Sequence, residues 1–304
     1  MTDRGIPSDH ILGFARSLLS HRVGGRHKPH EVFQTSTLVS LVEGLYDGNV
    51  TYKTVMRHGD FGVGTFNALD GEMVALDGKY FHLRSDGSVS PVSGDELTPF
   101  AAVTRFQPGV DHAEVGSLTR PQCEEVIRRL AGSDNLFYAL RIDGHFPSIR
   151  TRTVSKQSKP YPRLVDAAAS APVFTLTDVT GTIVGFHTPD YAQGIGVAGY
   201  HMHFLSADHQ SGGHVFDFTV DSPRIRIDTE GDLHLSLQTT EEFLSARLGD
   251  DVSAEIAGAE TSRPLPTAAS RSSVRHRSVR RRQLRERVPQ SKRLKGAKLG
   301  SSAA

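Results

Sequence analysis

The sequence predicts an α+β fold with two domains, in which mixed or antiparallel β-sheets are flanked by a few helices. Three observations support this prediction. The chain has 304 residues, a length typical of about two domains. Short β-prone runs recur along most of it, and Asp-Gly turn signals separate several of them. Only a few segments combine helical spacing of apolar residues with capping residues.

The first helix is predicted within FQTSTLVSLVEGLYDG. Ser36 or Thr37 offers a side-chain oxygen to the first turn, and the leucines and valine that follow recur at helical spacing. We expect Asp47-Gly48 to end this helix.

A β-meander is predicted next, in GVGTFNALDGEMVALDGKYFHLRSDGSVSPV. Asp70-Gly71, Asp77-Gly78 and Asp86-Gly87 lie between its short β-prone runs. Asp-Gly accepts the positive backbone dihedrals of tight hairpin turns, so each pair predicts a reversal of the chain. Glu72 then begins a strand, a position that by itself indicates no function.

A second helix is predicted in SLTRPQCEEVIRRLAG, with Thr119 as its cap, Pro121 in its first turn and Gly132 at its end. The segment LFYALRIDGHFPSIRTRTV predicts two strands around a turn at Asp143-Gly144. A Lys/Pro-rich connection follows at residues 155–172. Beyond it, strands are predicted in TIVGFH, VAGYHMHFLS, HVFDFTV, RIRID and LHLSLQ, and helices in TEEFLSARL and DDVSAEIAGAE.

The composition divides the chain into four segments. We expect residues 1–30 to form a mobile arm, residues 31–160 an N-terminal α+β domain with the meander, and residues 161–260 a C-terminal α+β domain. Residues 261–304 hold 13 lysines and arginines, one acid and few apolar residues, which predicts a disordered basic tail. The remainder holds 22 basic and 33 acidic residues, so an acidic body precedes this tail.

The composition also restricts the environment of the protein. No apolar run approaches the roughly 18 residues of a membrane span, and the N-terminus lacks a secretory cleavage signature. The single cysteine, Cys123, excludes an internal disulfide framework and fits a reducing compartment. We therefore expect a cytoplasmic protein that is not embedded in a membrane.

The segment GYHMHFLSADHQSGGHVFDF holds four histidines. Residues two apart on a strand share a face, so His201 and His203 point the same way. Met202 and Phe204 then point to the opposite, packed face. A His-x-His pair alone is more often ordinary polar surface than a metal site.

A third histidine strengthens the metal interpretation. The Gly-rich turn after the first strand allows His214, at the start of the returning strand, to lie opposite His201 and His203. Three histidine ligands with one open position form a catalytic zinc site, so a Zn²⁺ site is predicted on this hairpin of the C-terminal domain. His209 lies in the turn and is interpreted as a solvated loop residue.

Several blocks of the sequence closely resemble the α-acetolactate decarboxylase family. They run in order from about residue 32 to residue 260 and leave out the arm and the tail. The most specific block contains GFHTPDYAQGI, GYHMHFLS and GGHV. The others are FQTSTLVSLVEGLYDG, GDFGVGTFNALDGEMVALDGKYFHL and RTRTVSKQSKPYPRLVDA.

The resemblance implies a two-domain α+β enzyme, usually dimeric, that holds zinc through His201, His203 and His214. It implies decarboxylation of (2S)-2-acetolactate to (R)-acetoin, in which zinc chelates substrate oxygens and stabilises the enediolate. Further site residues carried over are Thr65, Glu72, Arg152 and Glu260. Glu255 is the rival for the last position.

The chemistry of these side chains suggests a role for each as a hypothesis. Arg152 would hold the departing carboxylate, and Glu72 and Glu260 are the candidate proton donors. From the sequence pattern alone, Arg150 and Arg152 would be ordinary charged residues of an edge strand.

Two other functions remain as alternatives. A cupin-like metal-binding protein or Fe(II) oxygenase also uses His-x-His, but the glutamate that usually follows within a few residues is missing after His203. The basic tail predicts at most weak, nonspecific and salt-dependent contact with nucleic acid, because no aromatic residue is interleaved to stack bases.

Overall fold

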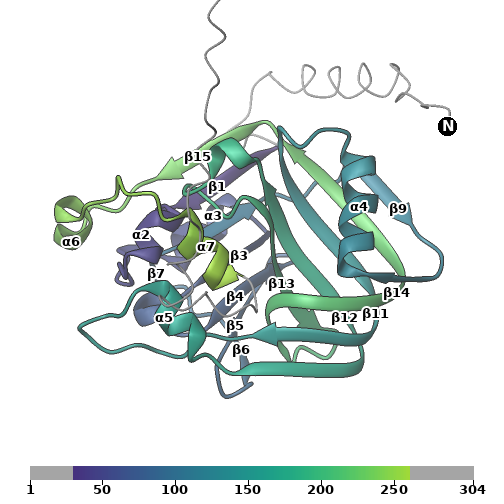
Figure 1. The fold of residues 1–304 in the computed structure, drawn as a ribbon, viewed down its shortest axis with the longest axis horizontal. Helices are drawn as coiled ribbons and strands as arrows, with labels where there is room; N and C mark the ends of the chain where they lie inside the picture. Colours follow the sequence, from purple (N-terminus) through teal and green to yellow (C-terminus); the bar gives the residue numbers. More distant parts are fainter. Residues whose placement is uncertain (1–29, 261–304) are drawn as a thin grey trace, which may run out of the picture. The chain divides into compact units, whose positions relative to one another are not determined.

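Two β-sheets pack face to face in the computed structural model, which describes residues 30–260 (Figure 1). Apolar residues from both inner faces form the core between the sheets, with Phe61, Val63 and Val74 from one and Val184 and Leu205 from the other. Helix α3 packs on the outer face of the first sheet, and helix α4 packs on the outer face of the second. The α+β class predicted from the sequence is confirmed.

The first sheet has seven strands in the order β15-β1-β8-β3-β4-β5-β6. It is mixed, because β1 pairs in parallel with β15 and antiparallel with β8. Its strands are β1 (Glu31–Thr35), β3 (Phe61–Thr65), β4 (Glu72–Leu76), β5 (Lys79–Leu83), β6 (Val89–Pro91), β8 (Ala101–Thr104) and β15 (Asp232–Ser236).

The second sheet runs β10-β14-β11-β12-β13, and β9 also pairs with β14. Strand β13 pairs with both β12 and β14, and β11 also pairs with both of them. The four strands β11 to β14 therefore form a closed ring of pairings. The strands are β9 (Val110–Ala113), β10 (Ser117–Thr119), β11 (Phe137–Arg152), β12 (Val173–Thr188), β13 (Gly199–Ser206) and β14 (Gly212–Glu230). A small third sheet joins β2 (Val50–Thr51) and β7 (Leu97–Thr98).

The helices are short. None of them, within residues 30–260, combines the length and apolar character that crossing a membrane requires. They are α2 (Leu38–Val42), α3 (Tyr52–His58), α4 (Arg120–Ala131), α5 (Leu164–Ala169), α6 (Glu241–Ser245) and α7 (Ser253–Glu260), with 3₁₀ turns η1 (Asn67–Leu69) and η2 (Asp190–Ala192).

The predicted division at residues 160 and 161 does not coincide with the division between the sheets. The chain leaves the first sheet after Thr104 and enters the second at Val110. It then returns to the first sheet through β15, which pairs with the first strand of that sheet. The predicted arm at residues 1–30, except His30, and the basic tail at residues 261–304 lie outside the described residues.

The first helix and the meander form where the sequence predicts them. Thr37, not Ser36, caps α2, because its hydroxyl accepts a hydrogen bond from the Ser40 amide. The helix ends earlier than Asp47-Gly48, since Gly44 takes a φ of +85° just after it. Strands β3 to β6 pair consecutively, as a meander requires.

Helix α4 also follows its predicted signals. Thr119 and Gln122 form a capping box at its start, and Gly132 ends it with a φ of +79°. The buried face of the helix, with Cys123, Val126 and Ile127, packs on the second sheet.

The predicted turn at Asp143-Gly144 is wrong, because β11 runs through it as one strand. The pairing of β11 with β14 shifts register between Asp143 and His145, which marks an irregularity of the bulge type. A Cβ on Gly144 would lie 2.6 Å from Val220 Cγ2, so the glycine allows close packing of the two strands. Likewise HVFDFTV and RIRID are not two strands but belong to the single strand β14.

Helices α2, α5 and α7 lie together at one end of the sheets (Figure 1). Their buried apolar residues form one cluster, which also includes residues next to β7 and β11. The members from the helices are Leu38, Leu41, Val42, Leu164, Ala167, Ala168, Ile256 and Ala259. This cluster closes one side of the pocket described below.

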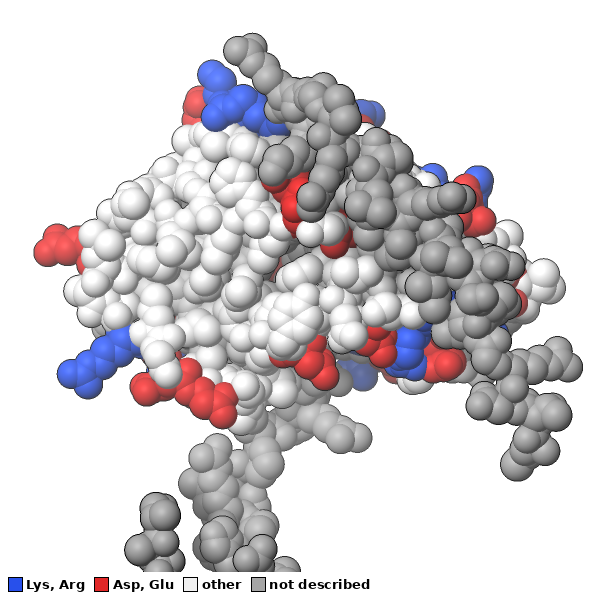
Figure 2. All heavy atoms as spheres, turned by 90° about the horizontal axis from the view of Figure 1, so that it is seen from above, with Lys and Arg blue, Asp and Glu red and all other residues white. Residues whose placement is uncertain are grey.

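Figure 2 shows the charged side chains on one face of the molecule. Among the described residues visible there, lysines and arginines stand apart from one another and beside acidic residues. The described residues that are visible in this view therefore form no continuous basic surface.

Candidate metal centre

Three histidines converge on the β13–β14 hairpin, as the sequence predicts. His203 and His214 are directly paired across the two strands, and His201 lies two residues before His203 on the same face. One ring nitrogen from each can be chosen so that all three lie within 4.8 Å of one another. This group could hold a metal ion. His209 stays outside it, and its ring packs against Phe81.

The environment keeps these imidazoles neutral. Burial and, to a smaller extent, the positive charge of Arg152 together lower the pKa of His201 to about 4. Burial also holds the pKa values of His203 and His214 well below their usual range. Neutral imidazole is the form that offers a lone pair to a metal, so the low pKa values fit this chemistry.

The hydrogen bonding of His203 fixes which nitrogen is free. Its Nδ1 lies 3.0 Å from the Met73 carbonyl oxygen, which can only accept, so Nδ1 carries the proton. Its Nε2 then holds the lone pair, and this buried atom has no hydrogen-bond partner among the described residues. A metal ligand supported by a backbone carbonyl has this arrangement, so the three histidines fit a zinc ion.

Two buried carboxyl groups lie beside the histidines. Glu72, the first residue of β4, places Oε2 3.6 Å from His203 Nε2, and Glu260, the last residue of α7, places Oε2 3.3 Å from His214 Nε2. Burial raises the pKa of each carboxyl to about 7, against the opposing effect of Arg152. Both groups therefore exchange a proton near neutral pH.

Arg152 is a pocket residue and not an ordinary charge on an edge strand, as the strand pattern alone suggested. Strand β11 lies between β12 and β14, and Arg152 pairs across it with His214. Its side chain is buried, with 5% of the residue exposed. The guanidinium lies over the ring of Phe216, 5.0 Å from the ring centre, so the aromatic face supports the buried charge.

Thr65 ends β3 opposite Glu72. Its buried hydroxyl donates a 2.6 Å hydrogen bond to the carbonyl of Gly71, the residue before Glu72. Gly71 takes a φ of +87°, which favours glycine. Thr65 thus fixes the turn from which the Glu72 strand begins.

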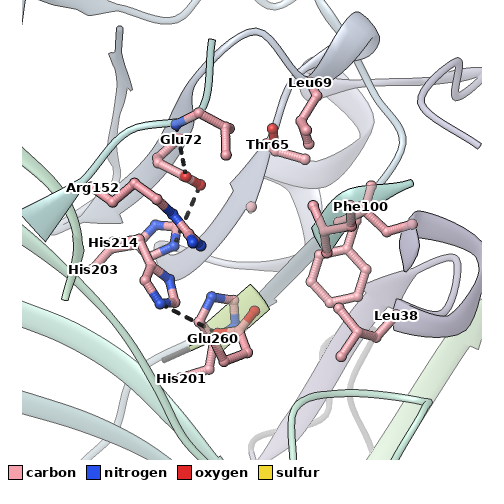
Figure 3. Close-up of a pocket in the computed structure, with 14 residues that line it drawn as sticks. Leu38, Thr65, Leu69, Glu72, Phe100, Arg152, His201, His203, His214 and Glu260 are labelled. Carbon is pink, nitrogen blue, oxygen red and sulfur yellow. Dashed lines mark hydrogen bonds and ion pairs between the residues drawn. The ribbon is translucent and has the colours of Figure 1, made fainter. Parts of the chain in front are cut away.

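All seven residues expected from the sequence line a single pocket at the end of the sheets (Figure 3). In Figure 3, Glu72 and Glu260 approach the histidines from different sides, with Arg152 near the centre. The opposite wall is apolar, and its residues come mainly from α2, η1, α5 and the loop after β7. They are Leu38, Leu41, Leu69, Phe100, Val154 and Leu164.

Glu255 and Glu260 lie in different surroundings. Glu260 lines the pocket, whereas Glu255 pairs with Arg163, where Arg163 Nε lies 2.7 Å from Glu255 Oε2. Glu255 therefore holds helix α7 from its outer side and does not belong to the pocket lining.

The sequence reasoning missed some residues that support the site. Phe216 lies two residues after His214, so strand alternation, applied one step further, places it on the same face. The Met73 carbonyl and the apolar wall carry no sequence signal of this kind, because their positions follow from the packing of the two sheets and the helices.

Known proteins resemble this chain over most of its described part. The family model described as Alpha-acetolactate decarboxylase matches residues 32–250. An alpha-acetolactate decarboxylase of Methylococcus capsulatus is 46% identical over 230 residues, covering 76% of this chain and 88% of that protein. One of Bacillus licheniformis is 45% identical over 231 residues, covering 76% and 91%.

A solved structure agrees with these relatives. The crystal structure of alpha-acetolactate decarboxylase from Bacillus subtilis strain 168 matches with a TM-score of 0.75 at 42% identity, covering 76% of this chain and 100% of that one. Glu260 lies beyond the range matched by the family model, so its place in the site comes from the geometry. The chain belongs to the alpha-acetolactate decarboxylase family.

Proposed function

We propose that this protein is a zinc-dependent acetolactate decarboxylase, a carboxy-lyase that converts (2S)-2-acetolactate to (R)-acetoin and carbon dioxide. The observation that carries the proposal is the convergence of three neutral histidines, Arg152 and two carboxyl groups in one buried pocket. The choice of acetolactate as substrate rests on membership of the family, and the pocket holds side chains whose chemistry suits that substrate.

The chemistry requires a site that accepts negative charge on oxygen. When the bond from C2 to the carboxylate breaks, its electron pair moves onto the neighbouring ketone, leaving carbon dioxide and an enediolate. A proton delivered to C2 then completes acetoin. A zinc ion held by His201, His203 and His214 would supply Lewis-acid polarisation of the substrate oxygens.

Arg152 is suited to binding the substrate carboxylate. A guanidinium stays charged and can bind a carboxylate through two parallel hydrogen bonds. Its Nε has no hydrogen-bond partner among the described residues, so donor capacity remains in the pocket. Phe216 under the guanidinium fixes its plane, and Thr65 keeps the neighbouring Glu72 turn in place.

Glu72 and Glu260 are the candidate proton donors. A pKa of about 7 lets a carboxyl hold a proton near neutral pH and release it to a developing carbanion. Because the two groups approach the histidines from different sides, the donor would determine which face of C2 is protonated. The apolar wall excludes water, which would otherwise deliver protons to either face.

Glu72→Gln and Glu260→Gln, each loaded with zinc, test these roles. We expect the variant that lacks the proton donor to lose most of its rate and to release acetoin of lower enantiomeric purity. The other variant should lose rate through changed electrostatics but keep the product configuration. If neither substitution altered rate or configuration, the assignment of the carboxyl groups would be wrong.

Metal analysis distinguishes this proposal from the cupin-like or Fe(II) oxygenase alternative. We expect about one zinc per chain and acetoin formation that needs no oxygen. Iron in the protein together with oxygen uptake would favour the oxygenase.

We also propose that the protein acts as a homodimer in the cytoplasm. The buried Cys123 thiol and the family resemblance support this proposal. The basic tail is proposed to contribute at most weak, nonspecific contact with nucleic acid. A measured mass of the particle in solution tests the dimer.

A further inference from the structure

Helix α7 carries Glu260 into the pocket, yet the chain that leads to it offers little support. The preceding helix, α6, has no buried residues, and most of residues 237–251 are exposed. In Figure 1, α6 projects away from the sheets before the chain turns back to α7. The position of Glu260 therefore depends on the contacts that α7 itself makes.

The apolar contacts of α7 are small. Ile256 and Ala259 are buried on the helix, with Val252 just before it, and they pack in one cluster with α5 residues such as Leu164 and Ala167. Several of these side chains are alanines, which leave the rotation of a short helix less defined than large interlocking side chains would. A directional contact is needed to fix that rotation.

Arg163 supplies this contact. Its Nε donates to Glu255 Oε2 on α7 at 2.7 Å, and its two terminal nitrogens donate to both oxygens of Glu43, next to α2, at 2.5 and 2.7 Å. Its own backbone is fixed, because its carbonyl accepts hydrogen bonds from the Asp166 and Ala167 amides at the start of α5. One guanidinium thus ties together the three helices that close the pocket.

We propose that Arg163 is a positioning residue of the enzyme, which places the Glu260 carboxyl beside His214 by holding α7 through Glu255. Glu255 and Glu260 are five residues apart on one helix, so a rotation of α7 at Glu255 moves Glu260 as well. The proposal rests on the proposed function, because it gives the placement of Glu260 a catalytic purpose.

An isolated ion pair at the surface would contribute little, and Arg163 is partly exposed. Three features set this one apart. The Glu43 contact is bidentate, which fixes the plane of the guanidinium. The same group then directs Nε at Glu255. Without the guanidinium, the two carboxylates would face each other without their cation, and α7 would be pushed away from α2.

The experiment compares zinc-loaded, full-length variants. Arg163→Met and Glu255→Gln should each lower kcat about tenfold or more, because small displacements of a catalytic group are costly. The double variant should be no slower than the slower single variant, since both changes break one contact. KM and the zinc content should stay near wild type, because the histidines and Arg152 are not on α7. Arg163→Lys should restore part of the rate.

Arg128→Met is a matched control. Arg128 also lies between two carboxylates, Glu125 and Asp134, but on α4 and away from the pocket. Its loss should leave kcat unchanged. Hydrogen exchange gives a second readout, in which the amides of residues 252–260 should exchange faster in Arg163→Met than in the control.

An unchanged kcat in Arg163→Met, additive losses in the double variant, or equal exchange of residues 252–260 in both arginine variants would overturn the proposal. A general loss of zinc and of the folded structure would also overturn it, because Arg163 would then be structural only. If the wild-type protein failed to decarboxylate acetolactate, the proposed function would fall. Hydrogen exchange alone would then decide whether Arg163 holds α7.

Discussion

Strand geometry places three histidines, His201, His203 and His214, in one site, and burial changes their pKa values. The same burial that lowers their pKa values raises those of Glu72 and Glu260. Neutral imidazoles can bind a metal, and carboxyl groups with a pKa near 7 can move a proton. Burial in the pocket is thus the largest cause of both kinds of shift.

Phe216→Leu tests the support of the guanidinium. The substitution removes the aromatic face under Arg152 while keeping an apolar side chain. A buried cation–π contact contributes about 1–2 kcal/mol, so kcat/KM for acetolactate should fall roughly 5- to 30-fold, with zinc content unchanged. Phe174→Leu, on β12 outside the pocket, is the control. Equal values of kcat/KM for the two variants would show that Phe216 does not support Arg152.

The sequence predicts the polar residues of the site better than their surroundings. Strand alternation and a Gly-rich turn are local signals, so the three histidines can be selected from the sequence alone. The family resemblance adds Thr65, Glu72, Arg152 and Glu260. The place of Glu260 depends on how α7 packs against α5, which no local pattern in EIAGAE encodes.

At the scale of elements, local signals in the sequence predict where a helix begins better than they predict how far a strand runs. Thr119 and Gly132 act only on their own turns, and α4 begins and ends as expected. Asp143-Gly144 has the same letters as the meander turns, but it lies inside β11 because both neighbouring strands pair past it. The parallel pairing of β15 with β1 joins residues about 200 positions apart, which no local pattern reveals.

Gly213→Ala tests the close approach of β14 to β11. Gly213 takes a φ of +150°, and a Cβ there would lie 2.7 Å from the Arg152 carbonyl oxygen. We expect a loss of about 1–3 kcal/mol in the free energy of unfolding, measured by urea denaturation of zinc-free protein. Gly249→Ala, where a Cβ meets open space, should change little. Equal stability of the two variants would contradict the packing described here.

At the scale of the whole molecule, a buried acid away from the pocket should make stability depend on pH. Burial, together with nearby Asp228, holds the pKa of the Glu230 carboxyl well above its usual value of 4.5. The folded state therefore keeps a proton that the unfolded chain releases above about pH 4.5. The stability that this carboxyl group contributes is therefore fully present below about pH 4.5 and falls as pH rises above that value.

Glu230→Gln tests this dependence. The variant should lose less stability than wild type as pH rises above about 4.5, as measured by urea denaturation at several pH values. Glu241→Gln, on the exposed helix α6, should follow the wild-type curve. A Glu230→Gln curve parallel to that of wild type would contradict the raised pKa.

The basic C-terminal residues should not be needed for catalysis. Every pocket residue lies between Leu38 and Glu260, so deletion of residues 265–304 should leave kcat, KM and zinc content unchanged. The shortened protein should lose any salt-dependent retention on DNA, because it loses most of the positive charge of the tail. Loss of decarboxylation on deletion would mean that the tail contributes to the enzyme.

The most direct test of the central claim is an acetoin assay on (2S)-2-acetolactate with zinc-free, zinc-restored and His203→Ala protein. We expect little acetoin from zinc-free protein, recovery of (R)-acetoin formation with about one zinc per chain, and no recovery for His203→Ala. His209→Ala should behave as wild type. Absence of acetoin from fully zinc-loaded wild-type protein, or equal activity with and without zinc, would contradict the account.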